Sequence, residues 1–163
     1  MGKNQKIILF TKISSISNIF KNKKTVLVGG CFDIFHYGHL KFLKQAKKQG
    51  DFLVIALESD EFIKRKKNRT PIHNQKQRAE ILSALSFVDL VILLHYFFSD
   101  KDYFNLVYQI KPKVIAITKG DPQEQNKEKQ AKIIGAKIVV VTSLIKSFSS
   151  TKIYKSYETF FSD

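Results

Sequence analysis

The feature that most constrains the fold is a regular alternation of short apolar runs with amphipathic stretches along the chain. Each apolar run is near-continuous and rich in β-branched residues, as expected for a strand buried on both sides, and a helical pattern follows each one. The predicted strands are residues 25–28, 51–59, 88–94, 113–118 and 136–143. This order predicts an α/β fold with a doubly wound, five-stranded parallel sheet.

Signals at the ends of the helical patterns agree with this prediction. Asn74 is placed to cap one helix, Pro112 requires the next helix to end before it, and Gly135 follows a third. A closing helix is predicted over residues 149–161. The helices are therefore expected between consecutive strands, which is the arrangement that right-handed crossovers need.

The chain divides into an extension and one domain. Residues 1–24 precede the first predicted strand and are interpreted as an N-terminal extension, with a short helical pattern around Ser15–Phe20. Residues 25–163 are predicted to form a single Rossmann-like domain, because no repeat, linker or second domain is recognisable. Such sheets bind ligands in a crevice at the carboxyl ends of their strands, so functional residues are expected there.

Composition excludes some classes of protein. The apolar runs are too short to cross a bilayer, so neither a signal peptide nor a membrane span is predicted. Cys31 is the one cysteine, which rules out an internal disulfide and fits a cytoplasmic location. The formal charge of +14, from 28 basic and 14 acidic residues, favours polyanionic partners such as nucleic acid, membrane surfaces or phosphate compounds, but is equally explained by a lysine-rich surface.

Two histidines lie three residues apart in "GGCFDIFHYGH", residues 29–39, between the first predicted strand and its helix. The glycines permit close approach of a ligand to the backbone. A helix beginning near Gly38 directs unpaired N–H groups and the positive end of its dipole into the crevice, which favours phosphate. His36 and His39 add side-chain donors suited to charge that develops on a phosphoryl group. The turn therefore predicts a phosphate site.

Other interpretations of this turn are weaker. A His-x-x-His pair without a third ligand nearby is poor support for zinc, so the chain is not expected to supply metal ligands. The dinucleotide fingerprint Gly-x-Gly-x-x-Gly and the Walker Gly-Lys-Ser/Thr pattern are both absent. The phosphate site is thus of a third kind.

The same stretch resembles the His-x-Gly-His signature of the cytidylyltransferase-like nucleotidyltransferases, and the resemblance extends over about residues 6–155. In that family a phosphate oxygen of the substrate attacks the α-phosphorus of a nucleoside triphosphate. Pyrophosphate leaves, and no covalent enzyme intermediate forms. The resemblance implies that Mg²⁺ enters with the nucleotide as cofactor.

The resemblance also implies roles for individual residues. It implies catalytic roles for His36, His39 and Lys66, with Lys66 facing the phosphates from the basic loop "KRKKNR". For Arg78 the resemblance implies either a contact with the substrate or a role in orienting this loop. His73 is interpreted as either a substrate contact or a loop residue. Nucleotide contacts are implied for Gly30, Cys31, Phe32, Asp33, His36, Gly38, His39, Lys119, Gly120, Asp121, Ser149, Ser150 and Thr151.

Within the family, "TPIHNQKQRAEILSALSFVDLVI" and "KPKVIAITKGD" most resemble heptose-1-phosphate adenylyltransferases. The Arg-Thr-Glu-Gly stretch of glycerol-3-phosphate cytidylyltransferases is missing, and residues 144–147 take its place. These features favour transfer of AMP from ATP to a phosphorylated small molecule, with a sugar phosphate preferred. A CTP-dependent enzyme acting on a phosphorylated alcohol such as glycerol 3-phosphate, and an FAD-synthetase-like adenylyltransferase, stay open.

A nucleotide- or nucleic-acid-binding protein without activity is the competing class. The sequence shows no aromatic-basic platform of the kind that nucleic-acid binding needs. No specific nucleic acid and no membrane are therefore expected as partners. The expected partners are ATP or CTP and a phosphorylated small molecule. The aromatic stretch "YFFSDKDYF", residues 96–104, is open between covering the substrate and forming a homodimer contact.

Overall fold

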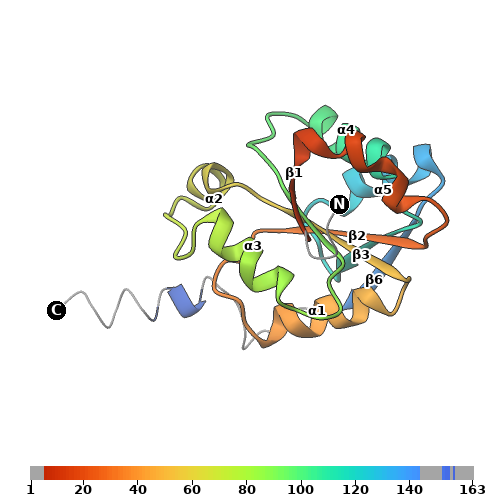
Figure 1. Ribbon diagram of the computed structural model, residues 1–163. Coiled ribbons are helices and arrows are strands. Elements are labelled where there is room, and N and C mark those ends of the chain that lie inside the picture. Colours follow the sequence, from red (N-terminus) through yellow and green to blue (C-terminus); the bar gives the residue numbers. More distant parts are fainter. Residues whose placement is uncertain (1–5, 144–151, 155, 157–163) are drawn as a thin grey trace.

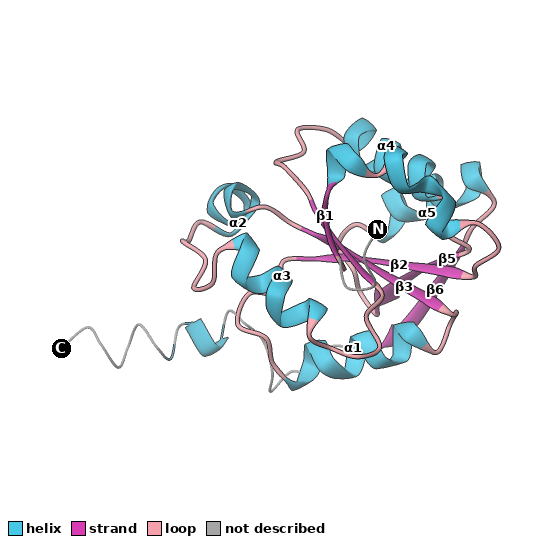
Figure 2. Ribbon diagram, in the orientation of Figure 1, coloured by secondary structure: helices cyan, strands magenta, loops and turns pink. Residues whose placement is uncertain are grey.

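A parallel sheet of six strands forms the centre of the molecule, with helices on both faces (Figures 1 and 2). This is a computed structural model, and it describes residues 6–143, 152–154 and 156. The strands, in the order β1-β4-β3-β2-β5-β6, are all parallel. Their bounds are β1 Ile7–Leu9, β2 Thr25–Gly30, β3 Phe52–Leu57, β4 Leu90–Leu93, β5 Val114–Thr118 and β6 Lys137–Thr142.

The five predicted strands are confirmed as β2 to β6, and the sheet has one strand more than predicted. The additional strand, β1, comes from the segment interpreted as an extension, and it pairs with β4 at the sheet edge. Two 3₁₀ helices follow it, η1 (Phe10–Lys12) and η2 (Ser14–Phe20), and η2 buries Ile16 and Phe20. Part of the segment before residue 25 is therefore built into the same sheet and core.

Helices α1 and α3 cover one face of the sheet, and α4 and α5 cover the other (Figure 1). Because side chains alternate along a strand, Val26 and Val28 of β2 pack on the α1–α3 face while Leu27 packs on the α4–α5 face. The helix bounds are α1 Tyr37–Lys47, α2 Asp60–Lys67, α3 Gln75–Ser83, α4 Asp100–Ile110 and α5 Glu124–Ile134.

The crevice that a doubly wound sheet provides lies beside β2. From β2 the chain builds β3 and β4 on one side, and then returns past β2 to place β5 and β6 on the other. Strand β2 pairs with β5 near their amino ends, where Val26 lies opposite Val114 and Leu27 lies opposite Ile115. Beyond these pairs the carboxyl ends of the two strands are at the topological switch point, where ligands bind in such folds.

The three signals predicted at helix ends are confirmed. Asn74 caps α3 in a capping box with Gln77, α4 ends at Ile110 before Pro112, and Gly135 ends α5 with a φ of 70°. Among the helices of the described residues, none combines the length and apolar character needed to cross a membrane.

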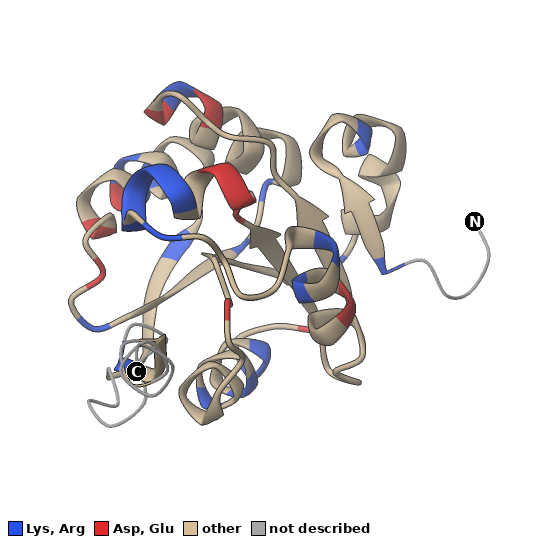
Figure 3. Ribbon diagram, turned by 90° about the vertical axis from the view of Figure 1, so that its left-hand side faces the viewer, with Lys and Arg blue, Asp and Glu red and all other residues tan. Residues whose placement is uncertain are grey.

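One segment differs from its prediction. The stretch interpreted as a basic loop is mostly the end of helix α2. Ser59 caps this helix, acidic residues fill its first turn and basic residues fill its last turn, so its charges complement the helix dipole. Figure 3 faces the side of the molecule that carries α2 and shows this acidic start and basic end. The lysines are therefore presented from a helix.

Candidate active site

The two histidines lie at the N-terminus of α1, as the sequence predicts. His36 is the N-cap residue, and its Nδ1 accepts a hydrogen bond from the backbone N–H of His39 at 3.4 Å. A neutral imidazole that accepts at Nδ1 carries its proton on Nε2, so the second ring nitrogen of His36 is a donor. Burial lowers the pKa of His36, which favours this neutral form.

His39 stacks on His36, with 3.8 Å between ring centroids and 18° between planes. Phe32 meets the His39 ring edge-on from another side, with 5.1 Å between centroids. Burial, the nearby His36 and the positive charge of Lys67 lower the pKa of His39 to about 3. The Nδ1 atom of His39 is buried and has no partner within the described part of the chain. Both imidazoles are thus neutral near pH 7 when no anion is bound.

The turn that leads to these histidines is under backbone strain. Phe32 and Ile34 both have left-handed backbone angles, with φ of 49° and 53°, which β-branched residues such as Ile34 rarely adopt. A Cβ atom at Gly30 would lie 2.9 Å from the Phe32 ring, so a larger residue there would displace the ring that supports His39. Strain of this kind persists where surrounding contacts hold it and is concentrated at functional sites.

Asp33 joins the turn to a second loop. Its carboxylate is buried and accepts hydrogen bonds from the Arg69 side chain and from the backbone N–H groups of Ile72 and His73. Burial by itself would raise the pKa of Asp33, but these three donors together outweigh it and lower the pKa. The Arg69 guanidinium also lies 4.9 Å from the ring centre of Tyr154. Asp33 is therefore a structural link between the histidine turn and the loop that precedes α3.

Arg78 lies inside the protein, behind the wall of the site. Its side chain is fully buried and donates to the carbonyl oxygens of Cys31, Glu58 and His73 and to Oδ1 of Asp60. All three guanidinium nitrogens are used in these contacts. The structure therefore favours the role of Arg78 in orienting the loops over the substrate contact that was also expected.

A pocket of about 780 Å³ opens on the α4–α5 side of β2. Gly29, Gly30 and Cys31 belong to its lining, so it adjoins the histidine turn, although His36 and His39 do not line it. Lys66 and its neighbour Lys67, both from the basic stretch "KRKKNR", line the pocket. Lys127 of α5 lines it too, although no sequence motif pointed to this lysine. The aromatic stretch supplies Phe97 and Phe98 to the lining, and the choice between covering a substrate and forming a dimer contact stays open.

Glu58 is a buried acid in the lining of this pocket. It is 7% exposed, and its Oε1 accepts a hydrogen bond from the hydroxyl of Tyr103 at 2.9 Å. Burial raises the pKa of Glu58 to about 7, although Tyr103, Lys127, Arg78 and Lys67 oppose this shift. Burial also raises the pKa of Cys31, so its thiol stays protonated and is a poor nucleophile.

The remaining predicted residues have separate positions. Lys119 and Gly120 are exposed in the turn after β5, where Gly120 has a φ of 76°. Asp121 lines the pocket and pairs with Lys127 at 2.7 Å. His73 is half-buried outside the pocket lining. Ser149, Ser150 and Thr151 lie outside the described residues.

No three His, Cys, Asp or Glu side chains gather to hold a metal ion within residues 6–143, 152–154 and 156. Three carboxylates near the pocket have cationic partners: Arg69 for Asp33, Arg78 for Asp60 and Lys127 for Asp121. Glu58 and Asp100 also line the pocket and form no ion pair among the described residues. A divalent cation here would draw most of its oxygen ligands from a phosphate compound and water, which is how Mg²⁺ usually binds beside nucleotides.

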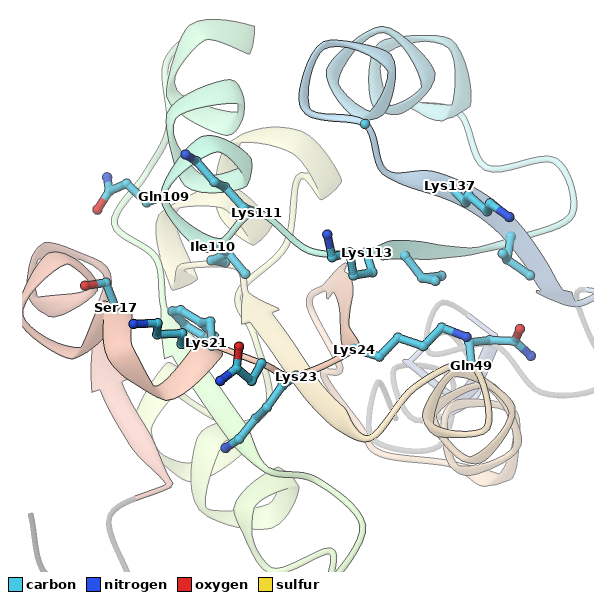
Figure 4. A pocket seen from close by; sticks show the side chains of 15 residues that line it. Ser17, Lys21, Lys23, Lys24, Gln49, Gln109, Ile110, Lys111, Lys113 and Lys137 are labelled. Carbon is cyan, nitrogen blue, oxygen red and sulfur yellow. The ribbon is translucent and has the colours of Figure 1, made fainter.

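A second pocket, of about 1070 Å³, lies at the opposite end of the parallel strands, where the strands begin (Figure 4). It is formed where chain segments enter the amino ends of β2, β5 and β6, and none of its described lining residues is acidic. Its lysines are Lys21, Lys23, Lys24, Lys111, Lys113 and Lys137. In Figure 4 their side chains surround a broad hollow, which we call the lysine groove. It is separated from the histidine turn by the length of the strands.

Comparison with known proteins places this site in context. The bifunctional protein HldE of Campylobacter jejuni is 38% identical over 136 residues, which are 81% of this chain and 27% of that protein. The chain thus spans about a quarter of the HldE relatives. The FAD synthase of Thermococcus sibiricus is 37% identical over 146 residues, which are 86% of this chain and 97% of that protein.

Solved structures agree with these relationships. The lipopolysaccharide core biosynthesis protein of Thermoplasma volcanium superposes with a TM-score of 0.60 at 32% identity, over 76% of this chain and 98% of that one. Pantothenate synthetase of Thermus thermophilus gives a TM-score of 0.68 at 15% identity, over 95% of this chain and 69% of that one, which shows a shared fold. The cytidylyltransferase-like family model matches residues 27–158, and the chain belongs to this family.

Proposed function

We propose that this protein is a nucleotidyltransferase that transfers AMP from ATP to a phosphorylated small molecule, preferably a sugar phosphate, and releases pyrophosphate. The observation that carries the proposal is the pair of stacked histidines at the N-terminus of α1, beside a pocket lined by lysines. Similarity to proteins named HldE and FAD synthase supports an adenylyl donor.

The histidine turn would bind the triphosphate of the nucleotide. Backbone N–H groups at the start of α1 and the Nε2 donor of His36 are preorganised there by the cap contact with His39. The negative charge of a bound triphosphate would raise the pKa of His39, since an opposite charge favours the protonated ring. The two rings would then stabilise the charge that develops on the α-phosphoryl group.

The lysine-lined pocket would hold the acceptor. Lys66 and Lys67 from α2 and Lys127 from α5 line this pocket, and their ammonium groups would bind its phosphate. An oxygen of that phosphate forms the new bond to the α-phosphorus, while the bond from the α-phosphorus to the bridging oxygen breaks and pyrophosphate leaves with that electron pair. The reaction needs no nucleophilic side chain, in agreement with the protonated thiol of Cys31.

Magnesium is part of the proposal. When bound, Mg²⁺ would neutralise charge on the triphosphate and on the departing pyrophosphate. Its ligands would be mainly phosphate oxygens and water, because Asp33, Asp60 and Asp121 are already paired with cations. We further propose that the reaction takes place in the cytoplasm and that nucleic acid is no specific partner of the positive charge.

A pyrophosphate-release assay with ATP and CTP tests this function. Acceptors would be sugar 1-phosphates, glycerol 3-phosphate and riboflavin 5′-phosphate, the last because the FAD synthase relative matches the chain over most of its length. We expect ATP-dependent release with a sugar phosphate and a phosphoanhydride product. Faster release with CTP and glycerol 3-phosphate would contradict the choice of ATP, and selective use of riboflavin 5′-phosphate would establish the flavin alternative.

A further inference from the structure

Glu58 occupies an unusual place in the pocket proposed for the acceptor. It follows the last residue of β3, and its backbone N–H donates to the carbonyl oxygen of Gly30 at 3.0 Å, so its position is fixed relative to the histidine turn. Its side chain is among the pocket-lining groups and is 7% exposed. No step of the proposed reaction uses it.

The carboxylate of Glu58 is only half satisfied. Oε1 accepts from the Tyr103 hydroxyl at 2.9 Å, whereas Oε2 is buried and has no hydrogen-bond partner among the residues that the structure describes. A buried acceptor without a donor is costly, and a donor on a ligand would remove that cost. The terminal torsion of glutamate is broad, so a small rotation can turn an oxygen toward the pocket.

The charges around Glu58 indicate which donor fits. Lys67 on α2, Arg78 on α3 and Lys127 on α5 act on it from three helices, and Tyr103 on α4 and Cys31 after β2 are the other titratable neighbours. A cationic amine on the acceptor would be repelled by this set of cations. A neutral hydroxyl would be accepted by the carboxylate without that repulsion.

We propose that Glu58 determines acceptor specificity by accepting a hydrogen bond from a hydroxyl on the non-phosphorylated part of a sugar or polyol phosphate. The inference rests on the proposed function, because it assigns the pocket to the acceptor. It adds the residue that recognises the acceptor and the hydroxyl group through which that residue selects it. The lysines bind the phosphate, which every acceptor carries, and Glu58 distinguishes polyhydroxylated acceptors from others.

A substrate-side experiment tests this on the unaltered protein, so it does not depend on a variant folding. Pyrophosphate release with ATP is measured for sugar 1-phosphates, their monodeoxy analogues, glycerol 3-phosphate and ethanolamine phosphate. We expect one deoxy analogue to lose on the order of tenfold to 100-fold in kcat/KM, because it leaves the buried carboxylate without its donor. Equal rates for all deoxy analogues, or a preference for ethanolamine phosphate, would overturn the proposal.

The variant Glu58→Gln supplies the matching protein-side test. Glutamine keeps the shape but replaces one acceptor oxygen by a donor. We expect the KM of the best acceptor to rise about tenfold while the KM of ATP stays within about twofold, and the penalty for the deoxy analogue to disappear. Glu80→Gln, an exposed substitution on α3, is the control and should change neither constant. An intact deoxy penalty in Glu58→Gln would show that another residue reads the hydroxyl.

Two further readouts separate recognition from other roles. The acceptor KM of the wild type should fall as the pH rises through about 7, where the carboxylate forms, and this fall should be smaller in Glu58→Gln. Titration of the acceptor's own phosphate affects both proteins equally, so the difference between wild type and Glu58→Gln reports on Glu58 alone. A changed half-saturation for Mg²⁺ would instead identify Glu58 as a metal ligand and contradict the proposal. No release with any acceptor would refute the proposed function itself, whereas transfer indifferent to Glu58 refutes only this inference.

Discussion

Buried charged residues hold the functional turn in place. Arg78 joins the carbonyl oxygens after β2 and β3 to the loop before α3, and Asp33 joins the histidine turn to the same loop. Arg78 could be predicted as a site residue from the sequence, because it lies in a stretch that resembles the cytidylyltransferase-like family. It could not show whether the guanidinium faces a ligand or the protein interior, because that depends on contacts between segments far apart in the chain.

The pair of Asp33 and Arg69 gives a stability prediction. Asp33→Asn removes the negative charge opposite a guanidinium that is 8% exposed, and leaves that cation nearly buried without a counter-charge. We expect a loss of about 3 kcal/mol or more in the free energy of unfolding, measured by urea denaturation. Glu61→Gln, which breaks the exposed pair with Arg65, is the control and should leave stability unchanged. Equal effects would mean that the buried pair is not a structural link.

Glu58 gives a prediction for the pH dependence of stability. Its pKa is about 7 in the folded protein, against 4.5 for the free side chain, so the folded state binds the proton more tightly. This contribution to stability is present below pH 4.5 and is lost as the pH rises through 7. Glu58→Gln should therefore gain thermal stability relative to the wild type at pH 8 but not at pH 5. The same difference in melting temperature at both pH values would contradict the shifted pKa.

At the scale of elements, local pattern predicted the long elements and missed two others. Strands β2 to β6 were predictable because each is an apolar run bounded by turn or cap residues. Strand β1 was missed because three residues are too few to show a period, and its place at the sheet edge depends on pairing with β4. Helix α2 was missed because its basic last turn resembles a solvated loop, although Ser59 and the acids after it form a start signal.

The role of β1 can be tested by shortening one side chain. Ile8 is 7% exposed and belongs to the core on the α4–α5 face, whereas its neighbour Leu9 is 54% exposed. Ile8→Ala should cost about 2–5 kcal/mol in the free energy of unfolding, because it leaves a cavity between β1 and the core. Leu9→Ala should cost less than about 0.5 kcal/mol. If both variants unfold like the wild type, β1 is not part of the cooperative unit.

At the scale of the whole molecule, part of the positive charge gathers in two clusters, one at each end of the parallel strands. The proposed acceptor pocket, at the carboxyl ends of the strands, is lined by Lys66, Lys67 and Lys127. The six lysines of the lysine groove lie at the amino ends. The sequence could count these charges but could not separate the two groups, because the residues of the groove come from distant segments. Since the groove shares no lining residue with the proposed acceptor pocket, we expect it to contribute to nonspecific polyanion binding and not to the reaction.

This division predicts that polyanion binding and catalysis can be changed independently. The double variant Lys113→Glu and Lys137→Glu should weaken binding of duplex DNA at low salt and reduce the slope of log affinity against log salt, since each phosphate contact contributes about −0.9. Pyrophosphate release should not change. The control is Lys41→Glu with Lys44→Glu, on the exposed face of α1. DNA binding that is sequence-selective and survives physiological salt would contradict the proposed absence of a specific nucleic-acid partner.

The most direct test of the central claim compares turnover with nucleotide binding in His39→Ala. If the stacked histidines stabilise charge on the α-phosphoryl group, pyrophosphate release should fall on the order of 10²–10³-fold, the usual effect of losing one preorganised donor. The dissociation constant of ATP, measured by calorimetry with Mg²⁺, should change far less, because the backbone donors of α1 and the lysines remain. Near-normal turnover in His39→Ala would show that the histidine pair is structural and that the chemistry takes place elsewhere.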